Sequence, residues 1–178
     1  QSLRDLASNA TTVNVLLKFF KKFKEYYAQL FILGQNLPIE KEIKQRTGLK
    51  CFGADQESLA SVVIDLLRKR KETLSVAESC SGGGIGAALT AIPGSSDVFL
   101  GGIIAYNNLI KTNLLKVPES LIQRHGAVSM EVAKAMAEGV LKEFKSDWSI
   151  SVSGLAGPSG ATQSKPIGLV QFCIQGPR

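Results

Sequence analysis

The spacing of apolar and polar positions divides this chain into a short amino-terminal part and a longer carboxy-terminal part. Between Val13 and Phe31 apolar residues recur at steps of three and four, with lysines largely between them. This spacing predicts one amphipathic helix with a buried face, although a basic and aromatic stripe would also suit a membrane surface or a partner protein. The pattern then predicts a charged helix over 39–47, a short strand over 49–52 and a linker turn over 53–55. We place a domain boundary there, which gives domains of residues 1–54 and 55–178.

In the longer part, predicted strands alternate with predicted helices. Apolar runs predict strands over 73–77, 98–106, 148–153 and 167–174, and helical spacing predicts helices over 59–71, 107–116, 118–124 and 130–144. Asp55 or Ser58 is the expected cap of the first of these helices, and Ser129 that of the last. The alternation predicts the α/β class, as a three-layer α/β/α domain with a mixed sheet, preceded by a small α+β unit.

The composition is that of a globular protein. Of the 178 residues, 44% are hydrophobic and 20% charged, enough for one full core and a small second unit. No apolar run approaches the roughly 20 residues that span a bilayer, and residues 1–12 lack the order of a signal peptide, so we expect a cytoplasmic protein. Three distant cysteines and a single histidine support neither a disulfide framework nor a zinc site.

The net charge of +6 raises the question of nucleic-acid binding, but this charge is spread along the chain. Residues 1–57 hold nine Lys and Arg against six acids, and residues 58–178 hold twelve against nine. The densest basic cluster outside the first predicted helix is 68–71, at a helix end, where the helix dipole itself favours cations. A solvated helix end is favoured over a polyanion site, so we expect no stable nucleic-acid complex and no membrane association.

The segment 77–84 carries the most informative chemistry, because a strand ends there in a glycine-rich helix start. Ligands usually bind at the carboxyl ends of strands in an α/β sheet, and amides near Gly82 and Gly83 would suit a phosphate or a developing oxyanion. Glycine at these positions would also simply allow tight packing of helix against strand.

A serine nucleophile in this segment needs a base, and the choice is narrow. His125, the only histidine, stands at a predicted helix end, where it would more often satisfy carbonyl groups than act in a triad. A lysine whose pKa is lowered by burial is the alternative base. Lys111 follows a buried strand by about one helical turn, so Tyr106 and Lys111 would share a sheet edge with Ser79. On spacing alone Lys111 also fits a solvated helix lysine.

A long loop over 153–168 joins the last two predicted strands. Its hydroxyl groups, its backbone amides and Lys165 suit an anionic small molecule, and a mobile hairpin connection is the alternative.

These segments belong to a set of short blocks that follow one another in order. The blocks are AESCSGG (77–83), PGSS (93–96), FLGG (99–102), YNNLIK (106–111), HGAVS (125–129), AKAMAEG (133–139) and GLAGPSGATQSKPIG (154–168). Together they resemble the CinA carboxy-terminal domain family, the nicotinamide-nucleotide amidohydrolases or NMN deamidases, over residues 57–176. Residues 1–56 resemble, more loosely, the small KH-like linker that precedes this domain in full-length CinA proteins.

The resemblance implies hydrolysis of the carboxamide of nicotinamide mononucleotide (NMN) to nicotinate mononucleotide and ammonia, without a metal or other cofactor. It implies Ser79 as the nucleophile, with Tyr106 and Lys111 as its catalytic partners. Cys80 is the rival nucleophile, but the sequence shows no cationic partner beside it, so we interpret it as a packing residue. For the substrate, and above all its phosphate, we assign the glycine-rich start and the long loop, represented by Ser81, Gly82, Gly83, Gly157, Thr162 and Lys165.

The family domain continues with a further strand and a helix that carries an arginine, so we expect this chain to be a fragment of a longer protein. We also expect a homo-oligomer, with a dimer favoured. Two alternatives stay open for the function: a catalytically silent scaffold or nucleotide-binding module associated with competence and DNA-damage proteins, and an amidase that acts on a different amide.

Overall fold

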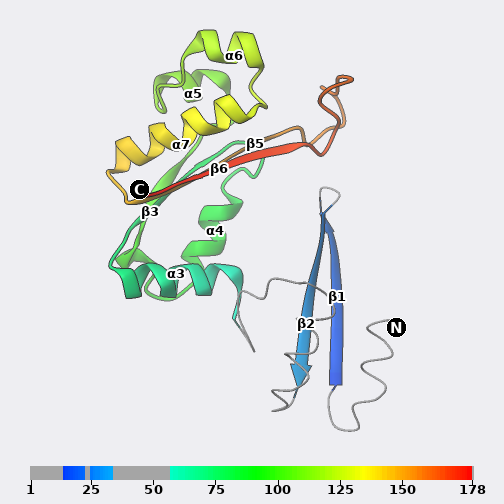
Figure 1. The fold of residues 1–178 in the computed structure, drawn as a ribbon, viewed down its shortest axis with the longest axis vertical. Helices are drawn as coiled ribbons and strands as arrows, with labels where there is room; N and C mark the ends of the chain where they lie inside the picture. Colours follow the sequence, from blue (N-terminus) through cyan, green and yellow to red (C-terminus); the bar gives the residue numbers. More distant parts are fainter. Residues whose placement is uncertain (1–13, 23–24, 34–56, 178) are drawn as a thin grey trace. The chain divides into compact units, whose positions relative to one another are not determined.

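A computed structural model describes the backbone of residues 14–22 and 25–33, and residues 57–177 with their side chains. The chain divides into two compact units, residues 1–62 and 63–178, and each is described by itself (Figure 1). The predicted helix over 39–47, strand over 49–52, turn over 53–55 and domain boundary near residue 54 lie outside the described residues.

The amino-terminal unit contains a β-hairpin where the spacing predicted a helix. Strand β1 (Asn14–Lys22) pairs antiparallel with β2 (Glu25–Leu33), in a register that places Asn14 opposite Leu33 and Lys22 opposite Glu25. The prediction of one helix over 13–31 is therefore wrong. Apolar residues are so dense here that they fit either period, and the segment is rich in Phe, Tyr and Val, which favour strands.

Residues 57–177 contain alternating strands and helices, as predicted. The elements are α3 (Leu59–Arg70), β3 (Leu74–Glu78), α4 (Gly84–Thr90), the 3₁₀ helix η1 (Ser95–Asp97), β4 (Phe99–Ile104), α5 (Asn108–Asn113), α6 (Glu119–His125), α7 (Met130–Phe144), β5 (Trp148–Gly154) and β6 (Val170–Gln175). Ser58 caps α3 by accepting from the Ser61 amide at 3.0 Å, and Ser129 caps α7 by accepting from the Val132 amide at 3.3 Å. Both serine caps are confirmed.

The sheet has the strand order β4-β3-β5-β6. Strand β3 runs parallel to β4 and β5, whereas β6 is antiparallel to β5, so the sheet is mixed. Helix α7 packs against all four strands on one face, with α6 beyond it, and α4 packs against β3 and β4 on the other (Figure 1). The predicted three-layer α/β arrangement is confirmed. Among the described residues, no helix is both long and apolar enough to span a bilayer.

Helix α7 is joined to the sheet by hydrogen bonds from small strand residues. Four buried strand serines donate hydrogen bonds to backbone carbonyls on or just before α7: Ser75 to Val140, Ser149 to Ala137, Ser151 to Ala133 and Ser153 to Ala127. On another side of α7, a Cβ atom at Gly139 would lie 2.0 Å from the Leu115 carbonyl oxygen. Only glycine allows this approach. These contacts fix α7, and with it the chain that follows β4, relative to the strand ends.

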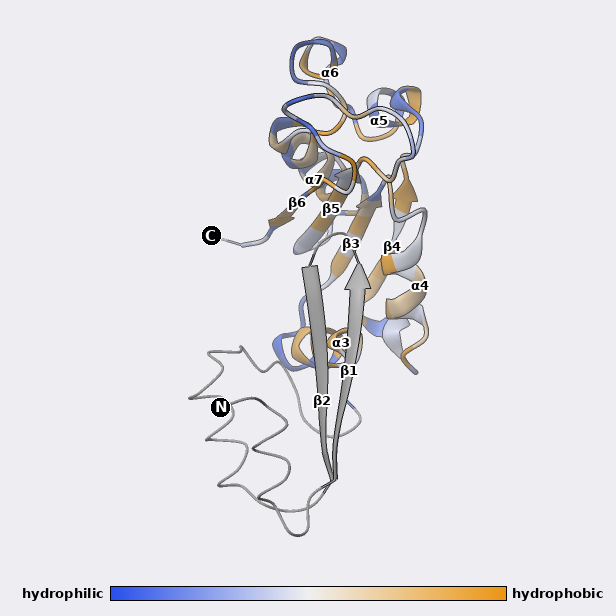
Figure 2. Cartoon of the chain, turned by 90° about the vertical axis from the view of Figure 1, so that its right-hand side faces the viewer, coloured by the Kyte–Doolittle hydropathy of each residue, from blue (hydrophilic) through white to orange (hydrophobic). Residues whose placement is uncertain are grey.

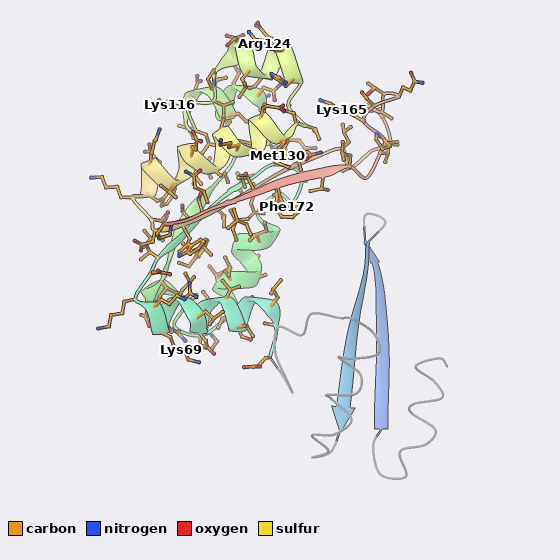
Figure 3. The ribbon with its side chains drawn as sticks, in the orientation of Figure 1. Lys69, Lys116, Arg124, Met130, Lys165 and Phe172 are labelled. Atoms are coloured by element: carbon orange, nitrogen blue, oxygen red, sulfur yellow. The ribbon has the colours of Figure 1, made fainter. Side chains whose placement is uncertain are left out.

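The opposite face of the sheet is less fully covered. Ser151 pairs with Cys173 and points toward α7, so strand alternation places Phe172 and Ile174 on the other face. These two side chains are 59% and 58% exposed. Figure 2 shows hydrophobic stretches on β3 and β4, and Figure 3 shows Phe172 on the side of β6 away from α7.

Candidate active site

Ser79 lies directly after β3, at the carboxyl end of the central part of the sheet. Its amide donates to the Val152 carbonyl on β5 at 3.0 Å, and its carbonyl accepts from the Gly82 amide at 3.1 Å. The residue is 7% exposed. Within the described residues its hydroxyl makes no hydrogen bond, so the backbone of Ser79 is fixed at both ends while its Oγ is uncommitted.

Lys111 is almost fully buried, with 1% of its surface exposed. It lies on α5, whose first turn is capped by Asn107, which accepts from the Leu109 amide at 2.8 Å. The Lys111 Nζ donates to the carbonyls of Ala105 at 2.7 Å and Tyr106 at 3.2 Å. Burial lowers the pKa of Lys111 below its ordinary value of 10.5. The solvated helix lysine considered from spacing does not describe this side chain.

The backbone brings this lysine next to the serine turn. The Ala105 amide donates to the Glu78 carbonyl at 2.7 Å, so the residue that holds Lys111 is itself bonded to the residue before Ser79. Lys111 also interacts electrostatically with Cys80, the residue after Ser79. The structure therefore places Ser79 and Lys111 at one sheet edge, where the ends of β3 and β4 meet.

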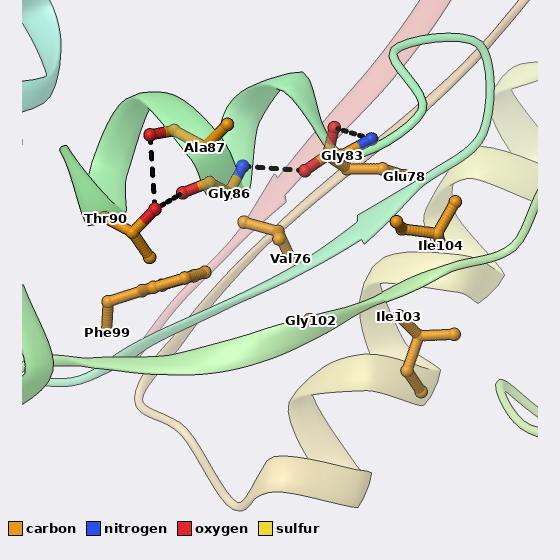
Figure 4. Close-up of a pocket in the computed structure, with 10 residues that line it drawn as sticks. All are labelled: Val76, Glu78, Gly83, Gly86, Ala87, Thr90, Phe99, Gly102, Ile103 and Ile104. Atoms are coloured by element: carbon orange, nitrogen blue, oxygen red, sulfur yellow. Dashed lines mark hydrogen bonds between the residues drawn. The ribbon is translucent and has the colours of Figure 1, made fainter.

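Glu78 controls the glycine-rich start of α4. Its side chain is 1% exposed, and its Oε2 accepts from the Ser81 hydroxyl at 2.6 Å and from the amides of Gly83 and Ile85 at 3.1 and 3.0 Å. Its Oε1 accepts from the Gly86 amide at 2.8 Å. Figure 4 shows the bonds to Gly83 and Gly86. A carboxylate of the chain thus occupies amides that the sequence suggested for an external anion.

The remaining amides of this turn fall into two groups, those that donate to backbone carbonyls and those that do not. The amides of Gly82 and Gly84 donate to the carbonyls of Ser79 and Ser81. Within the described part of the chain, the amides of Cys80 and Ser81 donate no backbone hydrogen bond. Three predicted phosphate-binding residues therefore use donors within the chain. The Ser81 hydroxyl and the Gly83 amide donate to Glu78, and the Gly82 amide donates to Ser79.

Cys80 is a poor nucleophile in this setting. Burial raises the pKa of its thiol, and the nearby amides of Cys80 and Ser81 act in the opposite, lowering direction. A raised pKa means less thiolate near neutral pH. A Cβ at Gly154 would lie 2.8 Å from the Cys80 sulfur, so this side chain packs against β5.

Tyr106 and His125 make no hydrogen bond to Ser79 in the part of the chain that the structure describes. Tyr106 contacts Lys111 through its backbone carbonyl, and the residue is 75% exposed. His125 ends α6, and its Nδ1 lies 3.5 Å from the Glu131 carboxylate on α7. The histidine carbonyl accepts a hydrogen bond from the Lys165 amine. No hydrogen bond joins His125 to Ser79 in the described part of the chain.

The loop between β5 and β6 is anchored to the end of α6 by the hydrogen bond from the Lys165 amine to the His125 carbonyl. Thr162 and Lys165 form a tight turn, with the Thr162 amide donating to the Lys165 carbonyl at 2.9 Å and the Lys165 amide donating to the Thr162 hydroxyl at 3.1 Å. Gly157 lies against the side chain of Ile167. Thr162 is exposed and Lys165 is half-buried. This loop lies beside the end of α6 (Figure 3), and we call its segment with Gly157, Thr162 and Lys165 the polar rim.

A small cavity of about 180 Å³ lies between α4 and the strands β3 and β4. Most of its lining is aliphatic, aromatic or glycine, including Val76, Ala87, Phe99 and Ile104, and Glu78 is its one charged side chain (Figure 4). The Glu78 oxygens are already bonded to Ser81 and to backbone amides. An apolar cavity with one negative charge does not suit an anionic nucleotide.

The sequence reasoning missed Glu78 as a member of the site. The available signal was an acidic residue at the end of an apolar strand, followed after three small residues by a run of glycines whose amides need acceptors. A carboxylate near a helix start is a favourable acceptor for such amides.

The fold and site define an α/β domain with a buried serine and a buried lysine at the carboxyl edge of a mixed sheet. A family model, described as the CinA C-terminal domain, matches residues 56–178. The chain belongs to this family, as the sequence blocks predicted.

Curated relatives support the same assignment. A CinA-like protein of Prochlorococcus marinus is 63% identical over 141 residues, which cover 79% of this chain and 33% of the relative. A CinA-like protein of a Synechococcus strain is 60% identical over 140 residues, covering 79% of this chain and 34% of the relative. The chain thus matches about a third of the length of these relatives.

Solved structures share the fold. The competence/damage-inducible protein CihA from Agrobacterium tumefaciens is 38% identical with a TM-score of 0.66, covering 72% of this chain and 78% of that protein. The competence damage-inducible protein A from Klebsiella pneumoniae is 34% identical with a TM-score of 0.64, covering 66% and 73%.

Proposed function

We propose that this domain hydrolyses the carboxamide of NMN to nicotinate mononucleotide and ammonia, with Ser79 as nucleophile and Lys111 as base. The observation that carries the proposal is the burial of Lys111 beside the Ser79 turn, with its amine held by two carbonyl groups. The choice of NMN rests on membership in the CinA family and on the amide chemistry that the sequence blocks imply.

The two carbonyls leave one position of the lysine amine open. A neutral amine has two N–H donors and one lone pair, and the carbonyls of Ala105 and Tyr106 accept from both donors. The lone pair then points away from these carbonyls and is open to a serine proton. Because burial lowers the Lys111 pKa, a larger share of the amine is neutral near physiological pH than in a solvated lysine.

The reaction then follows two acyl-transfer steps. Ser79 Oγ bonds to the carboxamide carbon while its proton passes to Lys111 Nζ, and the carboxamide oxygen becomes an oxyanion. The intermediate expels ammonia, which takes the proton from Lys111, and leaves an ester on Ser79. Water attacks this ester, Lys111 accepts a water proton, and nicotinate mononucleotide leaves as Ser79 regains its proton from the lysine.

Backbone and rim groups complete this scheme. The amides of Cys80 and Ser81 make no backbone hydrogen bond among the described residues and face the Cys80 sulfur. They are assigned to the oxyanion, since the other amides of the turn are bonded to backbone carbonyls or to Glu78. The phosphate is assigned to the polar rim that includes Gly157, Thr162 and Lys165, and the exposed ring of Tyr106 is assigned to the substrate.

The direct experiment measures ammonia and nicotinate mononucleotide after incubation of the full chain with NMN. Ser79→Ala is the control for the nucleophile, and circular dichroism checks that both proteins are folded. We expect product from the parent protein and none from Ser79→Ala. No ammonia above the Ser79→Ala control, with the fold intact, would contradict an NMN amidase and favour the scaffold alternative.

Nicotinamide and nicotinamide riboside serve as substrate controls because both keep the carboxamide and lack the phosphate. If the rim binds phosphate, kcat/KM for both should fall well below that for NMN. Equal rates on all three substrates would place the specificity elsewhere and support an amidase that acts on a different amide.

A further inference from the structure

Glu78 is a buried carboxylate without a cationic partner. It is 1% exposed, and none of the ion pairs among the described residues includes it. A charge removed from water is costly unless hydrogen bonds replace the lost solvation. Here three amides and one hydroxyl do so, and all four donors come from the segment Ser81–Gly86. The charge is therefore tied to one short piece of chain.

That piece of chain is the wall of the serine site. Glu78 precedes Ser79 directly, and its side chain reaches past Ser79 and Cys80 to Ser81 and to the first turn of α4. The bonds close a loop around Ser79, whose own carbonyl is held by Gly82. The N-cap residue of α4, Gly83, has a φ of 100° and provides no side-chain cap, so Glu78 takes the capping role from five residues away.

The same geometry excludes two other roles for Glu78. A carboxylate has about four acceptor positions, and four donors fill them, so no oxygen is open to a substrate proton. Its occupation of the Gly83, Ile85 and Gly86 amides also means that an external phosphate would have to displace it from this turn.

We propose that Glu78 is the positioning residue of this site: it holds the turn Ser79–Gly82 in the geometry that the nucleophile and the amides of Cys80 and Ser81 require. This inference rests on the proposed amidase function for its kinetic readout. In this role Glu78 acts entirely through the turn and touches neither the substrate nor the reacting atoms.

The test compares Glu78→Gln, which keeps the side-chain volume, with Glu143→Gln on the full chain. Glu143 is an exposed glutamate near the end of α7 and is the matched control. Glutamine turns an amide N–H₂ toward backbone donors, so the turn shifts. We expect kcat for NMN to fall about 10²-fold in Glu78→Gln with KM within about 3-fold, because small misplacements of reacting groups have effects of this size. Glu143→Gln should match the parent.

Ser81 supplies a second, milder pair of variants. Ser81→Ala removes one donor to Glu78 and should lower kcat by an intermediate factor, whereas Ser81→Thr keeps the hydroxyl and should restore it. A purely structural Glu78 would lower the unfolding midpoint of Glu78→Gln and leave kcat per folded molecule unchanged. That result would overturn the proposal.

Two readouts separate this proposal from the proposed function. Amide hydrogen exchange of the peptide 79–86 should accelerate in Glu78→Gln while the strands β5 and β6 exchange as in the parent. A fluorophosphonate probe should label Ser79 more slowly in the variant. If the parent hydrolyses no NMN, the amidase assignment fails and the exchange readout still decides. Unchanged exchange over 79–86 would overturn the role of Glu78 whether or not the parent is active.

Discussion

Replacing Lys111 by methionine tests the base with the least disturbance of the fold. Methionine keeps most of the buried stem and removes the amine that donates to the carbonyls of Ala105 and Tyr106. Losing a positioned base lowers turnover by about 10² or more, equivalent to about 2.7 kcal/mol of activation free energy. We therefore expect kcat for NMN to fall at least that far.

The expected stability change is smaller, because two effects oppose each other. Each carbonyl that loses its buried donor costs about 1–3 kcal/mol, whereas removal of the amine also removes the desolvation that lowers the Lys111 pKa. The net change should lie within about 2 kcal/mol. Since the folded protein binds the lysine proton more weakly than the unfolded chain, the parent should gain stability relative to Lys111→Met as pH rises from the lowered pKa toward 10.5.

Ammonia release per folded molecule, with urea unfolding measured in parallel, separates chemistry from folding. The matched control is Lys116→Met, because the Lys116 amine also donates to a backbone carbonyl, that of Asn113, but at an exposed position just after the same helix. In the parent, kcat/KM should rise with pH and level off below 10.5 as Lys111 loses its proton. An active Lys111→Met together with an inactive, folded His125→Ala would refute the serine–lysine mechanism.

Three further predictions concern packing and charge. Ser149→Ala should lower the free energy of unfolding by about 1 kcal/mol, because it removes the buried hydrogen bond to the Ala137 carbonyl, and urea titration would show no loss if that bond contributes nothing. Gly139→Ala should cost about 2–3 kcal/mol or more, since its Cβ would lie 2.0 Å from the Leu115 oxygen, and an unchanged midpoint would contradict this close approach. Duplex DNA should bind weakly and lose affinity steeply with salt, so submicromolar binding in roughly 200 mM salt, measured by fluorescence anisotropy, would show a basic surface that the spread charge does not predict.

The α/β fold was predictable from sequence because its strands and helices have clearly different periods and end at strong signals. Ser58 and Ser129 stand directly before apolar helical spacing, and glycines follow the end of β3. The segment 14–33 lacks such signals. Its apolar residues fit a helical face and a pair of strands equally well, and the pairing of β1 with β2 is a non-local property that a helical count does not contain.

The site was predictable in part. The positions of Ser79 and Lys111 at neighbouring strand ends follow from the alternation of elements, since parallel strands bring their carboxyl ends to one edge. The burial of Lys111 could not be read from spacing, because it depends on the Ala105 and Tyr106 carbonyls turning toward the amine after β4. The use of the glycine-rich amides by Glu78 was hidden for the same reason: sequence shows free donors but not which acceptor reaches them.

The two buried ionisable side chains at this edge differ in how completely they are bonded, and this difference argues for where the chemistry lies. Four donors surround the Glu78 carboxylate and leave it no open acceptor position. Lys111 has two acceptors for an amine that can carry up to three protons, so one of its positions is open beside the Ser79 turn. A group that is fully bonded in one protonation state holds structure, whereas a group with one open position can gain or lose a proton without breaking its other bonds. This argument supports the two proposed roles, Glu78 as the residue that shapes the turn and Lys111 as the base.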